Sequence, residues 1–213
     1  MDEASRQELQ WVRIGVIGGL WACLAYPVAI FVPLPLQMSA ALAASFGPAL
    51  ALGCVGLWRL IGLHHGSVAA AAAAGLNAIG GALFTAMLLV QMAIGVATGD
   101  QTERPLQAVW LGLDVAWDAY IGVGTALFAF SMLRHPRFGR VFGGTGLAIA
   151  LALLCFNLYT FPTPPQNAGL VDLGPGVGIW YLAVTLMTWQ SLSWAQGAQR
   201  SAAGLQPHAT APA

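Results

Sequence analysis

Long apolar runs, separated by short polar or Pro-rich stretches, dominate the chain. There are six such runs, and each is long enough for a helix to cross a hydrocarbon core of about 30 Å at about 1.5 Å per residue. The short alternating segments of a transmembrane barrel are absent. The pattern therefore predicts an all-α bundle of six transmembrane helices, over residues 11–32, 40–63, 68–97, 106–133, 141–161 and 176–195.

Composition supports a polytopic membrane protein. Of the 213 residues, 58% are hydrophobic and 8% are charged, and the mean hydropathy is +0.72. An ordinary soluble domain carries about 25% charged residues, so a soluble globular protein is excluded. The formal net charge is zero, with eight basic and eight acidic residues, so the chain has no basic surplus that would attract nucleic acid.

Small residues inside the runs indicate close packing between helices. Gly15 and Gly19 form a GxxxG pattern in the first run, which lets two helix backbones approach closely. The three cysteines each lie inside an apolar run, without CxxC spacing. We therefore expect Cys23, Cys54 and Cys155 to pack as small apolar residues, and we expect neither a disulfide framework nor a zinc site.

Arginine placement predicts the orientation. Seven of the eight arginines lie at run ends that share one side of the membrane, and only Arg104 lies on the other side. Because cytoplasmic loops retain arginine, we expect a multi-pass protein of a bacterial cytoplasmic membrane with both termini in the cytoplasm. We expect a cytoplasmic segment over residues 1–10, a transmembrane domain over 11–195 and a disordered cytoplasmic tail over 196–213. The Pro-rich outer stretch 162–175 would either cap the bundle or dip back into it.

Two aspartates inside the fourth run are the strongest chemical signal. Asp114 and Asp118 are four residues apart, so they share one helix face, and Asp118 lies near the middle of the run. A charged aspartate at that depth costs at least about 2.5 to 3.5 kcal/mol, and two such groups one turn apart would hardly ionise together. Such a pair suits a proton relay or a cation site. The alternative is a neutral, hydrogen-bonded structural network between helices.

Polar residues at matching depth in neighbouring runs are candidate partners of this pair. Gln91 and Asn77 share a similar face of the third run, and Tyr181 belongs to a helically spaced polar set in the sixth. We predict that these three side chains line a polar pocket around the aspartates, where a proton, a cation or a small polar solute binds. Each of them alone is also typical of an interhelical hydrogen bond.

A basic loop lies between the fourth and fifth runs and contains Arg134, Arg137 and Arg140. Topological anchoring, with contacts to anionic lipid headgroups, explains such a loop, and binding of a phosphate-bearing ligand is the alternative.

After the second run, His64 and His65 are adjacent, so on a helix they would point about 100° apart and make a poor chelate. We expect no metal and no cofactor.

The function classes follow from these residues. Neither a GxSxG nor an HExxH motif occurs. The sequence does not decide whether the protein is an enzyme, but it favours a protein without enzymatic activity. The leading prediction is an integral membrane protein, of transporter type, that binds or moves a proton, cation or small polar solute through its aspartate pair. The alternative is a non-catalytic membrane scaffold or subunit with structural aspartates. Expected partners are the lipid bilayer, a small solute or proton, and a second copy or another membrane protein, but no nucleic acid.

The hairpin between the fourth and fifth runs carries a family resemblance. In IGVGTALFAFSMLRHPRFGRVFGGTGLAIALALL, a glycine-bearing helix leads into a short basic turn with a proline and then into a glycine-rich helix start. It resembles an uncharacterised family of bacterial multi-pass membrane proteins, defined as a domain of unknown function. The matching positions, over about 35 of 213 residues, are Gly122, Gly124, Pro136, Gly139 and Gly143. The resemblance implies a six-helix membrane protein and implies no activity.

Overall fold

The computed structural model describes residues 3–96, 100–161 and 165–197. In these ranges the regular secondary structure is helical. The elements are α1 (Glu3–Phe31), α2 (Leu36–Gly62), α3 (Val68–Val96), α4 (Asp100–Met132), α5 (Gly139–Thr160), the short 3-10 helix η1 (Pro165–Ala168) and α6 (Gly174–Gln190). The predicted all-α class is confirmed.

Five of these helices are long and apolar enough to cross a membrane. Their candidate spans are Arg6–Phe31, Leu36–Gly62, Val68–Val96, Leu106–Met132 and Gly139–Thr160. They confirm that the chain has the helices of a multi-pass membrane protein, and they correspond to the first five predicted runs.

The sixth helix ends before the end of the predicted run. α6 has 17 residues, and a turn at Ser191 separates it from a further helical stretch over residues 192–197. At about 1.5 Å per residue, α6 itself is about 25 Å long. A sixth span therefore stays a prediction. Of the tail predicted over 196–213, residues 198–213 lie outside the described residues, and the first two residues belong to this last helical stretch.

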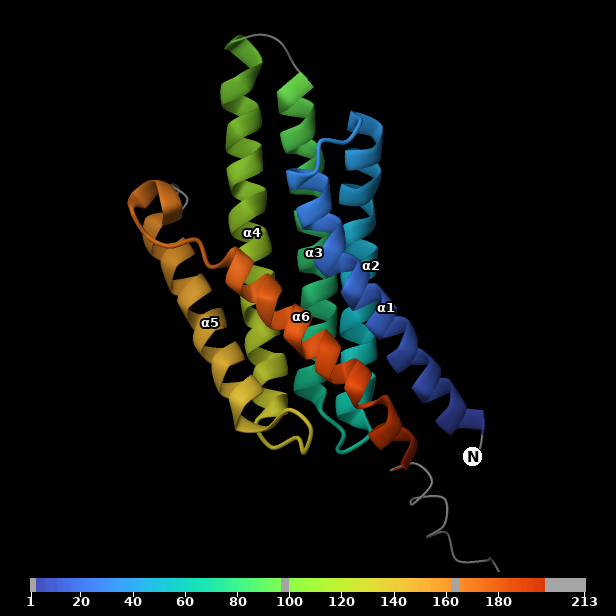
Figure 1. Cartoon of the computed structure of the whole chain (residues 1–213). Helices are drawn as coiled ribbons and strands as arrows, with labels where there is room; N and C mark the ends of the chain where they lie inside the picture. Colours follow the sequence, from blue (N-terminus) through green and yellow to red (C-terminus); the bar gives the residue numbers. More distant parts are fainter. Residues whose placement is uncertain (1–2, 97–99, 162–164, 198–213) are drawn as a thin grey trace, which may run out of the picture.

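Successive helices pack as neighbours from α1 to α5, and α6 lies across them. The closest helix pairs are α1 with α2, α2 with α3, α3 with α4 and α4 with α5, whereas α6 packs mainly against α1. Figure 1 shows that α6 begins midway along the bundle and runs obliquely toward the end where α1 starts. The same view shows the connection from η1 running back toward the middle of the bundle before α6 begins.

Glycines produce a very close helix crossing between α1 and α2. A Cβ atom added to Gly15 would collide with the backbone of Gly56, and one added to Gly53 would lie 2.9 Å from the Cα atom of Gly19. Real Cβ atoms essentially never come within 3.0 Å of another heavy atom. The predicted GxxxG face of the first helix is therefore used, and it meets a second glycine pair on α2.

We expect Gly56→Ala to lower the free energy of unfolding by about 1–3 kcal/mol, because the added methyl group must push α1 and α2 apart. The midpoint of heat denaturation in detergent measures this effect. The matched control is Gly75→Ala on α3, where no atom lies within 4 Å of the added carbon. Alanine is the better helix former, so this control should be neutral or stabilising. Equal midpoints for the two variants would contradict the close crossing.

Candidate acidic site

The aspartate face of α4 points toward α5. Asp118 is 7% exposed and Asn157 of α5 is 6% exposed. The Asn157 amide donates to the Leu153 carbonyl oxygen at 3.0 Å and lies within hydrogen-bonding reach of the Asp118 carboxyl group. One turn along α4, the Leu154 side chain of α5 occupies the space that a side chain at position 122 would need, so only glycine fits there. Close packing of these two helices therefore buries Asp118 beside an amide group.

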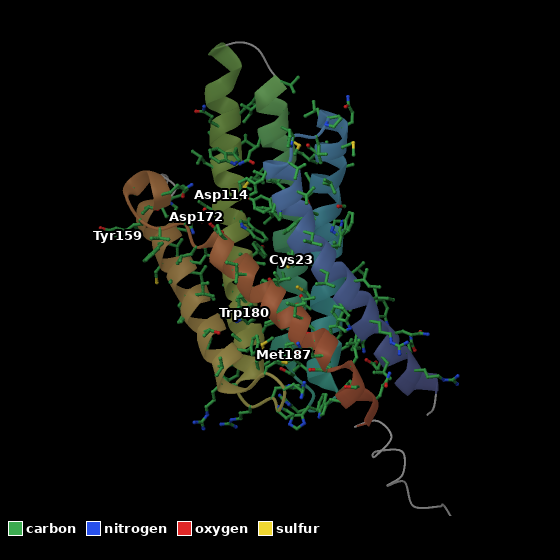
Figure 2. All side chains as sticks on the ribbon, in the orientation of Figure 1. Cys23, Asp114, Tyr159, Asp172, Trp180 and Met187 are labelled. Carbon is green, nitrogen blue, oxygen red and sulfur yellow. The ribbon has the colours of Figure 1, made fainter. Side chains whose placement is uncertain are left out.

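Asp114 lies one turn from Asp118 and is half-buried. The third carboxyl group of the site comes from Asp172, in the connection between α5 and α6, and it interacts electrostatically with both aspartates of α4. Figure 2 shows Asp172 beside Asp114. The Asp172 carboxylate also accepts a hydrogen bond from the Gly174 backbone N–H at 2.9 Å, which holds it at the start of α6.

Tyr26 of α1 also lies at the acidic site. It interacts electrostatically with Asp172 and with Asp114. Its ring packs edge-on against Phe84 of α3, with 5.1 Å between ring centroids. Phe84 in turn packs against Trp117, at 4.5 Å, so an aromatic wall covers the side of α4 next to the aspartates. The site thus draws side chains from α1, α4, α5 and the loop before α6.

Basic partners are missing from the described surroundings of the site. Among the side chains that the structure describes, the only ion pair joins Arg59 to Glu8, at 2.8 Å, near the other end of the bundle. The charged groups that act on the two aspartates of α4 are other carboxylates. The described part of the chain therefore provides no basic side chain to pair with these carboxyl groups.

Two of the predicted pocket residues form a separate network. The Tyr181 hydroxyl donates to the Asn77 side-chain oxygen at 2.7 Å and lies 3.1 Å from the Thr125 hydroxyl, and all three side chains are buried. The Asn77 amide nitrogen donates to the Ala73 carbonyl oxygen at 2.8 Å. Thr125 is seven residues from Asp118, or about 10 Å along α4. The structure therefore brings Asn77 and Tyr181 to each other and not to the aspartates.

Gln91, the remaining predicted pocket residue, is half-buried on α3. Its side chain makes no hydrogen bond within the described residues. Gly80 of α3 packs against Ile121 of the antiparallel helix α4, so Gln91, eleven residues further on, is roughly level with residue 110. It therefore lies about one turn beyond Asp114.

The basic loop between α4 and α5 is anchored to α6. The Arg137 guanidinium donates to the Ser191 hydroxyl at 3.0 Å through Nε, whereas Arg134 and Arg140 are exposed. These three arginines are far from the acidic site, at the opposite end of α4 (Figure 1). The loop thus fixes the end of the bundle and contributes nothing to the acidic site.

The same loop buries a histidine. His135 is 1% exposed, and its ring lies 5.5 Å from that of His64 and 6.4 Å from that of His65. Burial, with a smaller contribution from these two neighbours, lowers the pKa of His135 to about 4. Within the described residues, no group of three or more His, Cys, Asp or Glu side chains is arranged to hold a metal ion.

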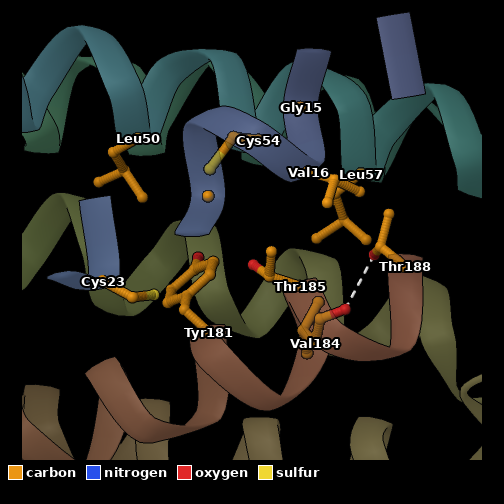
Figure 3. A pocket seen from close by; sticks show the side chains of 12 residues that line it. Gly15, Val16, Cys23, Leu50, Cys54, Leu57, Tyr181, Val184, Thr185 and Thr188 are labelled. Atoms are coloured by element: carbon orange, nitrogen blue, oxygen red, sulfur yellow. Dashed lines mark hydrogen bonds between the residues drawn. The ribbon is translucent and has the colours of Figure 1, made fainter. Parts of the chain in front are cut away.

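A small cavity between α1, α2 and α6 contains the two cysteines of this region (Figure 3). Cys23 and Cys54 line it together with Tyr181, Thr185 and Thr188. Its volume is about 20 Å³, which is enough for a single water molecule. It is therefore too small to bind an organic solute. Cys23 and Cys54 act as packing residues, as predicted, whereas Cys155 is exposed on α5.

Comparison with known proteins adds no assignment. No protein-family model, no curated protein and no solved structure matches the chain. The resemblance of residues 121–154 to an uncharacterised membrane-protein family therefore stays a prediction. The function has to be inferred from the side chains that the fold brings together.

The sequence prediction of the site did not include Asp172 or Tyr26. A signal existed for Asp172, because the outer loop that contains it holds an acidic residue and no basic one. No such signal marks Tyr26, which precedes Pro27 in an ordinary apolar run. Its role depends on how α1 and α4 are rotated, which the sequence does not encode in any short motif.

Proposed function

We propose that this integral membrane protein binds a cation, with the proton as the simplest case, and moves it through the membrane by means of the acidic site. The observation that carries the proposal is the meeting of buried Asp118, half-buried Asp114 and exposed Asp172 at one edge of an apolar bundle, with no basic partner among the described side chains. A small polar solute with a positive charge would meet the same complementary groups.

The cost of burying carboxyl groups supports this function. Asp118 lies 12 residues beyond Leu106, the first residue of its candidate span, which is about 18 Å along the helix axis. Ionisable groups at such depth are expensive, and they mark ion and proton pathways in membrane proteins. A bound cation or proton removes the charge that makes the site unfavourable. The Asn157 amide then serves as a neutral neighbour that tolerates either state.

The proposed topology places the acidic site toward the outer face. The start of α1, the end of α2 and the loop between α4 and α5 lie at the same end of the bundle (Figure 1). That end holds Arg13, Arg59, Arg134, Arg137 and Arg140, which supports a cytoplasmic location for it in a bacterial cytoplasmic membrane. The proposal includes α6 as a sixth, oblique span. Asp114 and Asp172 would then be the groups nearer to the outside.

Flux measurements on reconstituted protein test this function. Vesicles that contain the purified protein and an enclosed pH-sensitive dye are given a potassium gradient with valinomycin, so that the membrane potential drives protons inward. If the proton is the substrate, we expect faster acidification than in protein-free vesicles. If a metal cation is the substrate, we expect sodium to bind above the protein-free background. If neither proton entry nor sodium binding exceeds the protein-free background, the proposal fails. The non-catalytic scaffold then becomes the better interpretation.

A further inference from the structure

A second site lies at the other end of the bundle, in a groove between the start of α1 and the end of α6. The groove has a volume of about 630 Å³, within the range of about 300–1,000 Å³ that is typical of ligand pockets. Its lining combines apolar and polar side chains: Arg13, Leu186, Trp189, Gln190, Leu192, Ser193 and Gln196. This mixture differs from the purely apolar surface that a helix presents to acyl chains.

Arg13 is the only charged residue in the groove lining, and it has no partner in the described part of the chain. It is exposed, and neither an ion pair nor a hydrogen bond of its side chain is present there. It lies two residues beyond Trp11, where the predicted apolar run of the first helix begins, so it is close to the predicted membrane surface. An arginine near the membrane surface lies within reach of lipid phosphate groups.

The remaining lining suits one molecule that is polar at one end and apolar at the other. Gln190, Ser193 and Gln196 offer hydrogen-bond donors near the guanidinium group. Trp189 is 56% exposed and Leu186 is 40% exposed, so both present apolar surface at the same groove. Exposed tryptophan is typical of the membrane–water interface. The groove therefore has the chemistry of a phosphate headgroup next to an acyl chain.

We propose that this groove binds an anionic phospholipid, with the Arg13 guanidinium on the lipid phosphate and with Trp189 and Leu186 against an acyl chain. Basic pockets between transmembrane helices bind the headgroups of anionic lipids in this manner. Charge complementarity favours a lipid over the chain's own residues 198–213, because their only charged side chain is another arginine, Arg200. The site is independent of the acidic site and of the function proposed for it.

Lipid binding to the full-length protein tests the proposal. Native mass spectrometry in detergent, with added phosphatidylglycerol or phosphatidylcholine, gives the affinity for each lipid. We expect tighter binding of phosphatidylglycerol, and we expect Arg13→Gln to weaken that binding about fivefold, since one basic residue contributes about 1 kcal/mol. Arg140→Gln removes an exposed arginine of the same end that does not line the groove, so this control should keep the wild-type affinity.

Three results would overturn the lipid site. The first is an unchanged affinity of Arg13→Gln for phosphatidylglycerol. The second is an equal loss in the Arg13 and Arg140 variants, which would indicate general surface electrostatics. The third is equal protection against heat denaturation by inorganic phosphate and by phosphatidylglycerol, because a lipid site requires the acyl chain. Since Arg13 is exposed, its variant should fold, and the denaturation midpoint without added lipid verifies this.

Discussion

Asp118→Asn is expected to reduce cation or proton flux in reconstituted vesicles at least about tenfold. A tenfold reduction corresponds to about 1.4 kcal/mol, either as a higher activation barrier or as weaker binding. The amide has the shape of the carboxyl group and keeps a hydrogen-bonding contact with Asn157. It neither carries negative charge nor releases a proton at physiological pH. The substitution therefore removes the proposed chemistry while it preserves the packing between α4 and α5.

A matched control separates loss of chemistry from loss of structure. Tyr181→Phe removes a buried hydroxyl from the network with Asn77 and Thr125, about two turns away from Asp118. It should cost about 1 kcal/mol of stability, as interhelical hydrogen bonds do, and should leave the flux unchanged. If Asp118→Asn keeps wild-type flux while Asp118→Ala fails to fold, the aspartate is structural and the transport proposal is wrong.

The helices were predictable because a long run of apolar residues directly marks a segment that is surrounded by lipid and not by water. The runs predicted over 40–63 and 68–97 became α2 and α3 with their ends displaced by only a few residues. The start of α1 was less predictable, since the helix continues into the polar segment as far as Glu3. Hydropathy marks the part of a helix that lies in lipid, and polar residues extend a helix into water without any change in that signal.

The end of the sixth helix shows a second limit of the pattern. The apolar run continues to residue 195, but α6 ends at Gln190. Ser191 interrupts it, with its hydroxyl group donating to the Met187 carbonyl oxygen at 2.7 Å and accepting from Arg137. Serine back-bonding competes with regular helix geometry. The partner in the α4–α5 loop is a tertiary contact, so no inspection of the run alone would have located the break.

The acidic site was predictable in its centre and not in its surroundings. The spacing of Asp114 and Asp118 placed them on one face because a helix repeats every 3.6 residues. The prediction of neighbours relied on depth alone and assumed upright helices. α6 crosses the bundle obliquely (Figure 1), and Tyr181 meets α3 and α4 at the level of Asn77 and Thr125. Helix tilt and rotation therefore decided which polar groups meet.

His135→Gln is expected to reduce the loss of stability that acid causes in the wild-type protein. The pKa of His135 is lowered from 6.5 to about 4 by burial, with His64, His65 and Arg137 adding positive charge nearby and the Leu60 carbonyl group opposing the shift. Between these two values the unfolded chain binds a proton that the folded chain does not. Stability must therefore fall as the pH drops from about 6.5 to about 4, and it should level off below that.

The expected size of this effect follows from proton linkage. A pKa lowered from 6.5 to about 4 corresponds to a loss of about 3 kcal/mol once the pH is below both values, and to none above pH 6.5. Glutamine retains an acceptor for the Arg137 backbone N–H, which donates to His135 Nδ1 at 3.2 Å in the wild type, and it does not titrate. The measurement is the heat-denaturation midpoint in detergent from pH 7 to pH 4.

The informative quantity is the pH dependence of each protein and not its absolute stability, because His135→Gln also changes packing beneath Trp194 and Phe138. The wild-type midpoint should fall more steeply than that of the variant between pH 6.5 and pH 4. His64→Gln is the control, since His64 is exposed and its removal should leave most of the slope in place. Parallel curves for wild type and His135→Gln would mean that His135 is protonated without opening the loop. The assignment of His135 as a buried, neutral histidine would then be wrong.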